Sequence, residues 1–353
     1  MSGQASKLRG VAIAVLGFWS ACASASTATY RVRVVDADTG LPVKEVDVYG
    51  GFVMLSRGWD NTPLPNLDRV RTDADGFCRV SGETDAGESY FGAGKRESYY
   101  DSKNGDVFFS GRSILKFGRW LPDDMTVTVR LDRVVRPIPL FAKRVGGVVY
   151  TEPLKPREPW CPSPYLYKDV VTTNRVAFSY DLAMGDWLPP YGAGEVADLT
   201  ATCWKEITGY KTYEVPAGFK TVTNYLSHAE ITFNGPDNGV CEVKPHELAG
   251  ILIREAPDAG YSARLSRWYE RRGENNSDKN RHYCFRIRTR RDAEGRIVSA
   301  LYGKVYGDFR INDLSGIAFT YYLNPTPNDR NLEFDRKTNF NLTDGREPKD
   351  IAP

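Results

Sequence analysis

The sequence lacks the short patterns that mark several enzyme classes. It contains no G-x-S-x-G segment, so the nucleophile elbow of the serine hydrolases is missing. His228, His246 and His282 are the only histidines, and no second histidine follows His246-Glu247 to complete an H-E-x-x-H zinc site. A pair of Cys241 with His246 lacks the flanking signatures of cysteine nucleophiles. These absences argue against serine hydrolase, metalloprotease and cysteine nucleophile chemistry.

Cysteine is scarce and widely spaced. No C-x-x-C pair is present, which argues against a zinc knot, and we expect no metal and no cofactor. Five cysteines follow the amino-terminal region: Cys78, Cys161, Cys203, Cys241 and Cys284. In an oxidising compartment they can form at most two disulfides, with one thiol left over. The spacing alone leaves the pairing open.

The chain also lacks an excess of one charge and a long apolar run. Lys and Arg total 47 against 45 for Asp and Glu. This balance provides no general attraction for nucleic acid, so we expect no nucleic-acid partner. After residue 25 no apolar stretch reaches the roughly 20 residues of a membrane-spanning helix, so we expect no transmembrane segment.

The first 25 residues are typical of a secretory signal peptide. Lys7 and Arg9 precede a short apolar run over residues 11–19, and small residues follow at 21–25. The sequence therefore predicts an exported protein, located in the periplasm, at the cell surface or outside the cell. A lipid anchor at Cys22 is the alternative, but Trp19 occupies the position where lipoprotein signals usually carry Leu.

The composition favours short strands joined by tight turns. Aromatic residues make up 12% of the chain, which contains 32 Gly and 21 Pro. Polar and apolar residues alternate over 30–34, 43–48, 77–80 and 125–131 in the first half, and over 229–233, 283–288, 297–309 and 317–323 in the second. Only residues 245–253 suggest a helical turn. We predict an all-β protein with two antiparallel β-sandwich domains, at 28–140 and 165–345, joined by a proline-rich segment at 141–164.

Two turn segments carry a family resemblance. Residues 34–50, VVDADTGLPVKEVDVYG, precede residues 72–80, TDADGFCRV. Together they resemble the carboxypeptidase regulatory-like, or transthyretin-like, domain over about residues 28–135. Its turn positions match Asp36, Thr39, Gly40 and Pro42, and then Thr72, Asp73, Asp75, Gly76 and Phe77. The resemblance implies a β-sandwich that serves as a non-catalytic accessory module.

The chain departs from that family in its long insertions at 50–71 and 92–111. The turn aspartates supply too few oxygens for a calcium loop, so we expect them to bond to their own turn backbones. Residues 185–194 and 321–335 also resemble stretches of secreted bacterial proteins in which a regulatory-like domain precedes a second β domain. That second resemblance concerns architecture and implies no activity.

The segment GDWLPPYGAG, residues 185–194, is the most distinctive stretch of the second half. Its acid, Asp186, lies near Glu195 and Asp198, and its aromatics Trp187 and Tyr191 are of the kind that stack on sugars. Paired carboxylates beside aromatics allow a glycosidase site. Prolines fix an extended chain, however, and glycines permit a bend, so a rigid structural corner is the favoured interpretation. The G-A-G-E-V-A run follows prolines rather than a strand, which argues against a nucleotide site.

A basic region covers residues 264–296, with eleven basic residues against five acids. Arg286, Arg288 and Arg290 are predicted to share one strand face, which is suited to an anionic glycan or a phosphate. The interspersed acids favour a solvated face instead. With Trp187 and Tyr191, these three arginines are the candidate ligand-binding residues.

The sequence thus favours an exported, non-catalytic envelope or surface module that binds glycan or another envelope component, such as an envelope protein. One alternative is a secreted carbohydrate-active hydrolase that uses Asp186 with Glu195 or Asp198. The other is a purely structural envelope protein.

Overall fold

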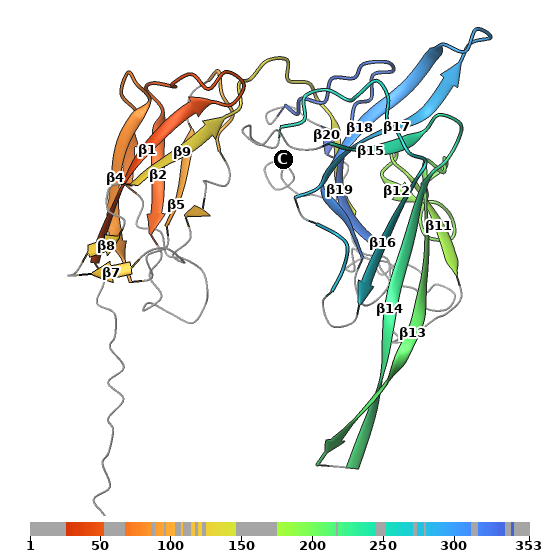
Figure 1. The fold of residues 1–353 in the computed structure, drawn as a ribbon. Helices are drawn as coiled ribbons and strands as arrows, with labels where there is room; N and C mark the ends of the chain where they lie inside the picture. The colour runs from red at the N-terminus through yellow and green to blue at the C-terminus, as the bar shows by residue number, and fades with distance from the viewer. Residues whose placement is uncertain are drawn as a thin grey trace, which may run out of the picture. The chain divides into compact units, whose positions relative to one another are not determined.

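The computed structural model describes residues 26–52, 68–85, 89–94, 97–102, 107–108, 114–116, 119–121, 125–145, 175–216, 218–243, 252–270, 274–278, 280–311, 317–335 and 340–341. Every regular element in these ranges is a strand, which confirms the predicted all-β class (Figure 1). The described part of the chain holds no helix that could cross a membrane. The chain divides into two compact units, residues 1–131 and residues 132–353.

Unit 1 contains two main sheets. The first has the order β4-β1-β9, from β4 (Phe77–Thr84), β1 (Ser26–Asp36) and β9 (Met125–Leu131). The second has the order β3-β2-β5-β6, from β3 (Asp68–Arg71), β2 (Asp47–Phe52), β5 (Ser89–Gly94) and β6 (Val107–Phe108). A short pair joins β7 (Ile114–Lys116) to β8 (Arg119–Leu121). The pairing of β1 with β9 is parallel, whereas the other pairings of this unit are antiparallel.

The core of unit 1 is formed by the faces that the alternation predicted. Val127, Val129 and Leu131 are buried, and the residues between them are less so. The rings of Phe52 and Phe91, both fully buried, pack edge to face with their centroids 6.1 Å apart. Side chains from β1, β2, β4, β5 and β9 meet in this one cluster. Unit 1 is therefore a small sandwich.

The two aspartate turns of unit 1 behave as predicted. Asp36 Oδ1 accepts hydrogen bonds from the backbone N–H groups of Asp38 and Thr39, at 3.0 and 2.9 Å. Asp73 Oδ1 accepts from the N–H groups of Asp75 and Phe77, at 3.0 and 2.8 Å. These bonds hold the chain in its turns, which confirms that both carboxylates bond to their own turn backbones.

Unit 2 contains two larger sheets. The six-stranded sheet has the order β15-β17-β18-β19-β10-β20, from β15 (Gly239–Val243), β17 (His282–Arg291), β18 (Ile297–Ile311), β19 (Ile317–Leu323), β10 (Phe141–Val145) and β20 (Phe340–Asn341). The five-stranded sheet has the order β12-β11-β13-β14-β16, from β12 (Asp186–Trp187), β11 (Val176–Asp181), β13 (Leu199–Val215), β14 (Gly218–Phe233) and β16 (Arg264–Glu270). The proline-rich segment expected at 141–164 begins with β10, which pairs with β19, and its remainder from 146 lies outside the described residues.

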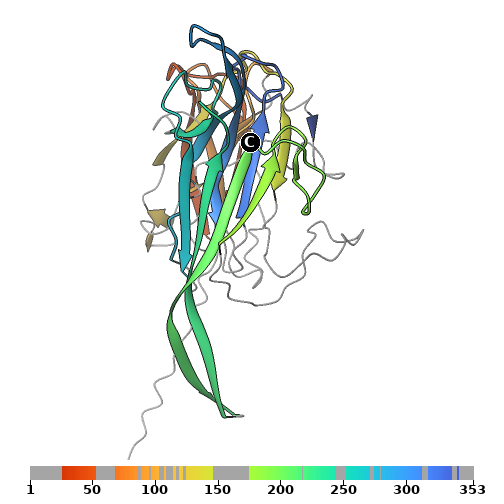
Figure 2. The same ribbon diagram turned by 90° about the vertical axis from the view of Figure 1, so that its right-hand side faces the viewer.

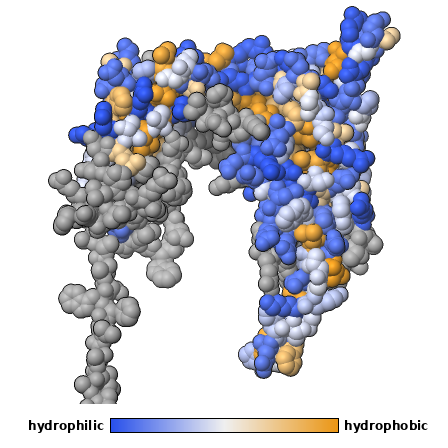
Figure 3. All heavy atoms as spheres, viewed as in Figure 1, coloured by the Kyte–Doolittle hydropathy of each residue, from blue (hydrophilic) through white to orange (hydrophobic). Residues whose placement is uncertain are grey.

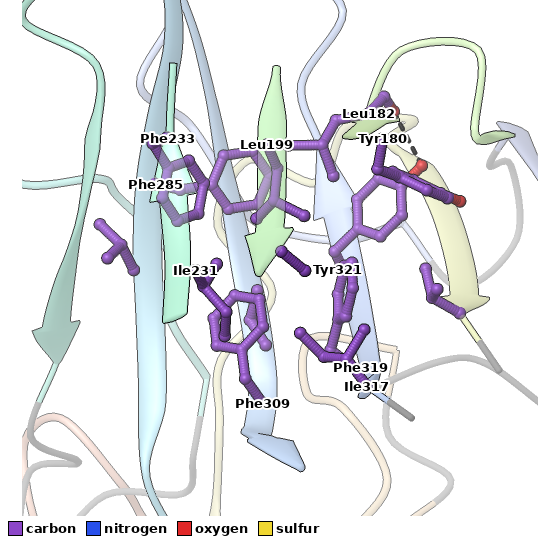
Figure 4. Close-up of a cluster of buried hydrophobic side chains, with 14 of the residues drawn as sticks. Tyr180, Leu182, Leu199, Ile231, Phe233, Phe285, Phe309, Ile317, Phe319 and Tyr321 are labelled. Atoms are coloured by element: carbon purple, nitrogen blue, oxygen red, sulfur yellow. Dashed lines mark hydrogen bonds between the residues drawn. The ribbon is translucent and has the colours of Figure 1, made fainter. Parts of the chain in front are cut away.

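The main core of unit 2 lies between these two sheets (Figure 4). Tyr180 from β11 and Tyr321 from β19 pack edge to face, with ring centroids 6.2 Å apart. Tyr321 donates a hydrogen bond of 2.8 Å to the backbone carbonyl of Leu182. Phe233 and Phe285, also from opposite sheets, stack with centroids 5.9 Å apart. Aromatic contacts of this kind join the two layers into a sandwich.

The six-stranded sheet is also covered on its outer face. Loop residues Ile253, Ala256 and Leu332 bury Cys284 and Tyr302 there. On the same sheet Lys304 is fully buried, and its Nζ donates to the carbonyls of Ile253 and Leu332.

One hairpin extends well beyond its sheet. β13 and β14 pair along their whole length, from Leu199–Phe233 to Val215–Gly218. β11 pairs with β13 only as far as Cys203, and β16 pairs with β14 only from Leu226 onward. Figures 1 and 2 show the remaining length of the hairpin projecting from unit 2 as a two-stranded ribbon. We call residues 204–225 the arm.

Several predicted features lie outside the described residues. These are the signal peptide at 1–25 with Cys22, the cysteine Cys161, the histidine His246, and residues 245–251 of the expected helical turn.

Candidate functional site

Asp186, one of the three candidate carboxylates, holds the turn that follows it. Its Oδ1 accepts from the backbone N–H of Trp187 at 2.9 Å, and its Oδ2 accepts from the N–H of Ala193 at 3.0 Å. A Cβ at Gly192 would lie 2.5 Å from the Trp187 carbonyl oxygen, so only glycine fits there without a shift. Asp186 and the glycine together close the loop.

Trp187 and Tyr191 point toward the core from this loop. Trp187 is 6% exposed, and its ring lies 4.7 Å from Tyr180 and 4.9 Å from Phe178 between centroids. Tyr191 is partly buried, and its ring lies 6.2 Å from Phe178. The peptide bond between Pro189 and Pro190 is cis. The loop thus has the contacts of a structural corner, with its tryptophan as the anchor.

The other two carboxylates differ in their surroundings. Glu195 is exposed, and its backbone N–H donates to Asp181 Oδ2 at 3.2 Å. Asp198 is buried, with both carboxylate oxygens bonded to the Arg288 guanidinium at 2.9 Å. Asp186 and Asp198 therefore have protein partners already.

Arg288 is the centre of a charged cluster that joins the two sheets of unit 2. It lies on β17, and its Nη2 also donates to Asp181 Oδ1, at 2.8 Å, at the end of β11. Its side chain is 33% exposed, whereas those of Asp181 and Asp198 are each 1% exposed. Burial raises the pKa of the Asp198 carboxyl, and Arg288 opposes that rise.

Asp181 also accepts several backbone hydrogen bonds. The N–H groups of Ala183 and Met184 reach its Oδ1 at 3.0 and 2.9 Å, and that of Val196 reaches its Oδ2 at 2.9 Å. Burial raises the pKa of Asp181, but these backbone donors and Arg288 outweigh burial, so the net shift is downward. The cluster is thus a satisfied ionic cross-link, and sequence analysis missed Asp181 as its member.

The predicted basic stripe of Arg286, Arg288 and Arg290 does not form. The register of β17 and β18 shifts between Ile287 and Arg290, and Arg288 has a positive φ of 52°. This bulge turns Arg288 toward the five-stranded sheet. Arg286 instead donates to the Asp237 carbonyl and covers the Tyr261 ring at 4.6 Å, and Arg290 is exposed. The expectation of one shared face is wrong because a bulge breaks the two-residue alternation.

The arm carries the exposed apolar residues that sequence analysis overlooked. Ile207 is 41% exposed, Tyr210 is 68% exposed and Phe219 is 77% exposed. In Figure 3 orange spheres are interspersed with pale and blue ones along the projection at the lower right. The sequence carried a signal for this hairpin, because runs rich in Thr, Tyr and Val flank the residues Pro216-Ala217-Gly218, a composition typical of a hairpin.

No cluster of three or more His, Cys, Asp or Glu residues in the described part of the chain is arranged to hold a metal ion.

Comparison with known proteins gives only weak similarity. No protein-family model matches the chain, and no curated protein matches it significantly. Among solved structures, BcpA, the major pilin subunit of Bacillus cereus, is 10% identical over 87% of this chain and 99% of that one, with a TM-score of 0.23. The minor pilin GBS52 of Streptococcus agalactiae is 19% identical over 32% of this chain, with a TM-score of 0.20.

A 3-chlorocatechol 1,2-dioxygenase from Rhodococcus opacus is 15% identical over 31% of this chain, with a TM-score of 0.23. The matched region spans 61% of the dioxygenase and 48% of the minor pilin. Similarity this weak carries no information on the function of this chain.

Proposed function

We propose that this chain is an exported, non-catalytic module of the cell surface or envelope, and that it binds another envelope protein through the arm. The observation that carries the proposal is the exposure of Tyr210 and Phe219 on a ribbon of two strands. Export is supported by the predicted signal peptide at residues 1–25.

The arm, as it stands in the isolated chain, contributes little stability and exposes apolar side chains. An isolated two-stranded ribbon is only marginally stable in water. Full burial of one large apolar side chain contributes about 1.5–3 kcal/mol, so the exposed side chains of Ile207, Tyr210 and Phe219 represent several kcal/mol of unused stabilisation. Exposed apolar surface of this kind is a recognised mark of protein contact sites.

The other long hairpin of unit 2 differs in character. At the tip of β17–β18, Arg296 pairs with Asp292 at 2.7 Å, and Arg291 pairs with Asp237 at 2.6 Å. Val298 is its one large exposed apolar residue within the described chain. Since both hairpins project into solvent, the apolar character of the arm is a property of its sequence and not of hairpins in general.

An enzymatic role finds less support. Asp186 bonds to its own loop, and Asp198 bonds to Arg288. A glycosidase mechanism would require at least one of these carboxylates to break its existing hydrogen bonds. Trp187 is largely buried, so a glycan site at this loop would require its exposure. We further propose that unit 1 is a regulatory-like domain, as its aspartate turns suggest.

The test compares the full chain with a Tyr210→Ser/Phe219→Ser double variant. Both are mixed with isolated cell envelopes, and the fraction that sediments is measured. Val298→Ser is the matched control, since it removes an exposed apolar side chain from the other hairpin. We expect the double variant to lose at least about tenfold in retention, at unchanged melting temperature, and the control to behave as the native chain.

Protease treatment of the envelopes distinguishes the classes of partner. Retention that disappears after treatment identifies a protein partner, as we expect. Retention that survives, and that purified polysaccharide or peptidoglycan reproduces, would instead identify a glycan ligand. Equal retention of the double variant and the native chain would refute binding through the arm. Cell fractionation and amino-terminal sequencing test export separately, with a mature start near Ser26 expected.

A further inference from the structure

Two of the free cysteines lie directly opposite each other. Cys241 on β15 and Cys284 on β17 are register partners in an antiparallel pair. Side chains at facing positions of such a pair point to the same side of the sheet. Facing Cα atoms are about 4.5–5.5 Å apart, which lies within the range of about 4.4–6.8 Å that a disulfide requires.

Both side chains enter one apolar cluster on the outer face of the six-stranded sheet. Cys284 is fully buried there, and Cys241 is partly buried against it, with Ile253, Ala256 and Tyr302 among their neighbours. The partial exposure of Cys241 leaves a path by which an oxidant reaches the pair. The two thiols therefore share one apolar cluster, in which Cys241 is the more accessible of the two.

The remaining described cysteines are separated from this pair. Cys203 on β13 belongs to the core between the two sheets, on the opposite side of the six-stranded sheet from Cys284. Cys78 lies in unit 1, on β4. Among the cysteines that the structure describes, Cys241 and Cys284 are thus the two that share a strand pair and a cluster.

The surroundings of the pair suit a structural bond better than a reactive thiol. Burial raises the pKa of both the Cys241 and the Cys284 thiol, so the thiolate form that nucleophilic catalysis needs is disfavoured. A disulfide carries no charge, and it therefore places none in the apolar cluster.

We infer that Cys241 and Cys284 form a cross-strand disulfide when the chain reaches an oxidising compartment. Cys241 as the thiolate attacks the disulfide of a donor and releases one donor thiolate. Cys284 then attacks the Cys241 sulfur of the mixed disulfide and releases the second. The two protein thiols are oxidised, the donor disulfide is reduced to two thiols, and two protons pass from the protein to the donor sulfurs. Whether the bond forms in the cell rests on the proposed export. The ability of the two cysteines to form it does not depend on export.

The bond can be tested in vitro, independently of export. The full chain is purified under reducing conditions, equilibrated with excess oxidised glutathione, quenched in acid and alkylated after denaturation. Peptide mapping is expected to show Cys241 linked to Cys284 and a mass decrease of about 2 Da per bond. If both cysteines are alkylated, or either one is linked to a different cysteine, the inference is wrong.

Thermal unfolding provides a second measurement. The bond closes a loop of about forty residues, so we expect the oxidised native chain to melt several degrees higher than the reduced chain. Cys241→Ser should abolish this difference, and Cys78→Ser, which removes a cysteine in the other unit, should preserve it. A difference that persists in Cys241→Ser would show that other cysteines form the bond and would overturn the inference.

Discussion

Arg267 on β16 and Asp308 on β18 form an ion pair that connects the two sheets of unit 2. Arg267 Nε and Nη2 donate to Asp308 Oδ1 at 2.9 and 2.7 Å. The two side chains are 4% and 0% exposed. Tyr283 accepts a further hydrogen bond from Arg267, and the backbone N–H of Asp278 donates to Asp308 Oδ2 at 2.9 Å. Each charge of this pair is thus satisfied inside the sandwich.

Asp308→Asn should destabilise unit 2 strongly, because it leaves the Arg267 charge buried without a counter-charge. Removal of one partner from a buried pair costs about 3–5 kcal/mol. Urea denaturation measures the free energy of unfolding. Arg296→Gln, which breaks an exposed pair with Asp292, is the control and should cost less than about 1 kcal/mol. If Asp308→Asn lowers the free energy of unfolding as little as the control does, the buried pair is not important for stability.

Arg288→Ala should also destabilise the chain, by roughly 3 kcal/mol at pH 7, because Asp181 and Asp198 are left as buried carboxylates without a counter-charge. The pKa values of both should then rise. Protonation relieves the repulsion, so the gap in unfolding free energy between native and variant should narrow as the pH falls toward 4. Arg290→Ala, at an exposed position on the same strand, should change stability by less than about 0.5 kcal/mol. A gap that stays constant with pH would argue against ionised carboxylates in the cluster.

His282 should make stability depend on pH between about 7 and 5. Burial lowers its pKa, although Asp278 and Asp308 oppose this, and its Nδ1 accepts from the Gly307 N–H at 3.0 Å. The folded state therefore favours the neutral ring. His282 therefore stabilises the folded state fully above its unfolded-state pKa of about 6.5. This stabilisation is lost as the pH falls through the lower pKa that His282 has in the folded state.

His282→Asn is the matched variant for this measurement, because Asn supplies an oxygen near the Nδ1 position and does not titrate. We expect the free energy of unfolding to fall less between pH 7 and pH 5 in this variant than in the native chain. Equal slopes would show that the titration of His282 does not contribute.

Trp187→Ala should destabilise unit 2 by about 3–5 kcal/mol, since it removes a buried ring that packs on Phe178 and Tyr180. Met184→Ala, in the neighbouring turn and 48% exposed, should change stability by less than about 0.5 kcal/mol. Chemical denaturation gives both values. A Trp187→Ala protein of native stability that has lost retention on polysaccharide would instead favour a sugar site at this loop.

Local pattern was sufficient for much of the fold. The strand predicted at 317–323 coincides with β19, and the inward face of Val127, Val129 and Leu131 follows from alternation alone. The bonds of Asp36 and Asp73 to their own turns were equally predictable, because both partners lie within a few residues. Such features depend on neighbours in the chain, which a sequence displays directly.

The candidate site was less accessible to sequence analysis. Arg288 was expected on a solvated stripe, yet a bulge turns it toward Asp181, which lies 107 positions earlier in the chain. Tyr210 and Tyr225, on paired strands of one hairpin, are 68% and 2% exposed, although both belong to similar alternating runs. The sequence by itself determined which residues form strands and turns. Tertiary structure decided which strand faces are buried and which charged side chains form ion pairs, because both depend on contacts between segments that are distant in the sequence.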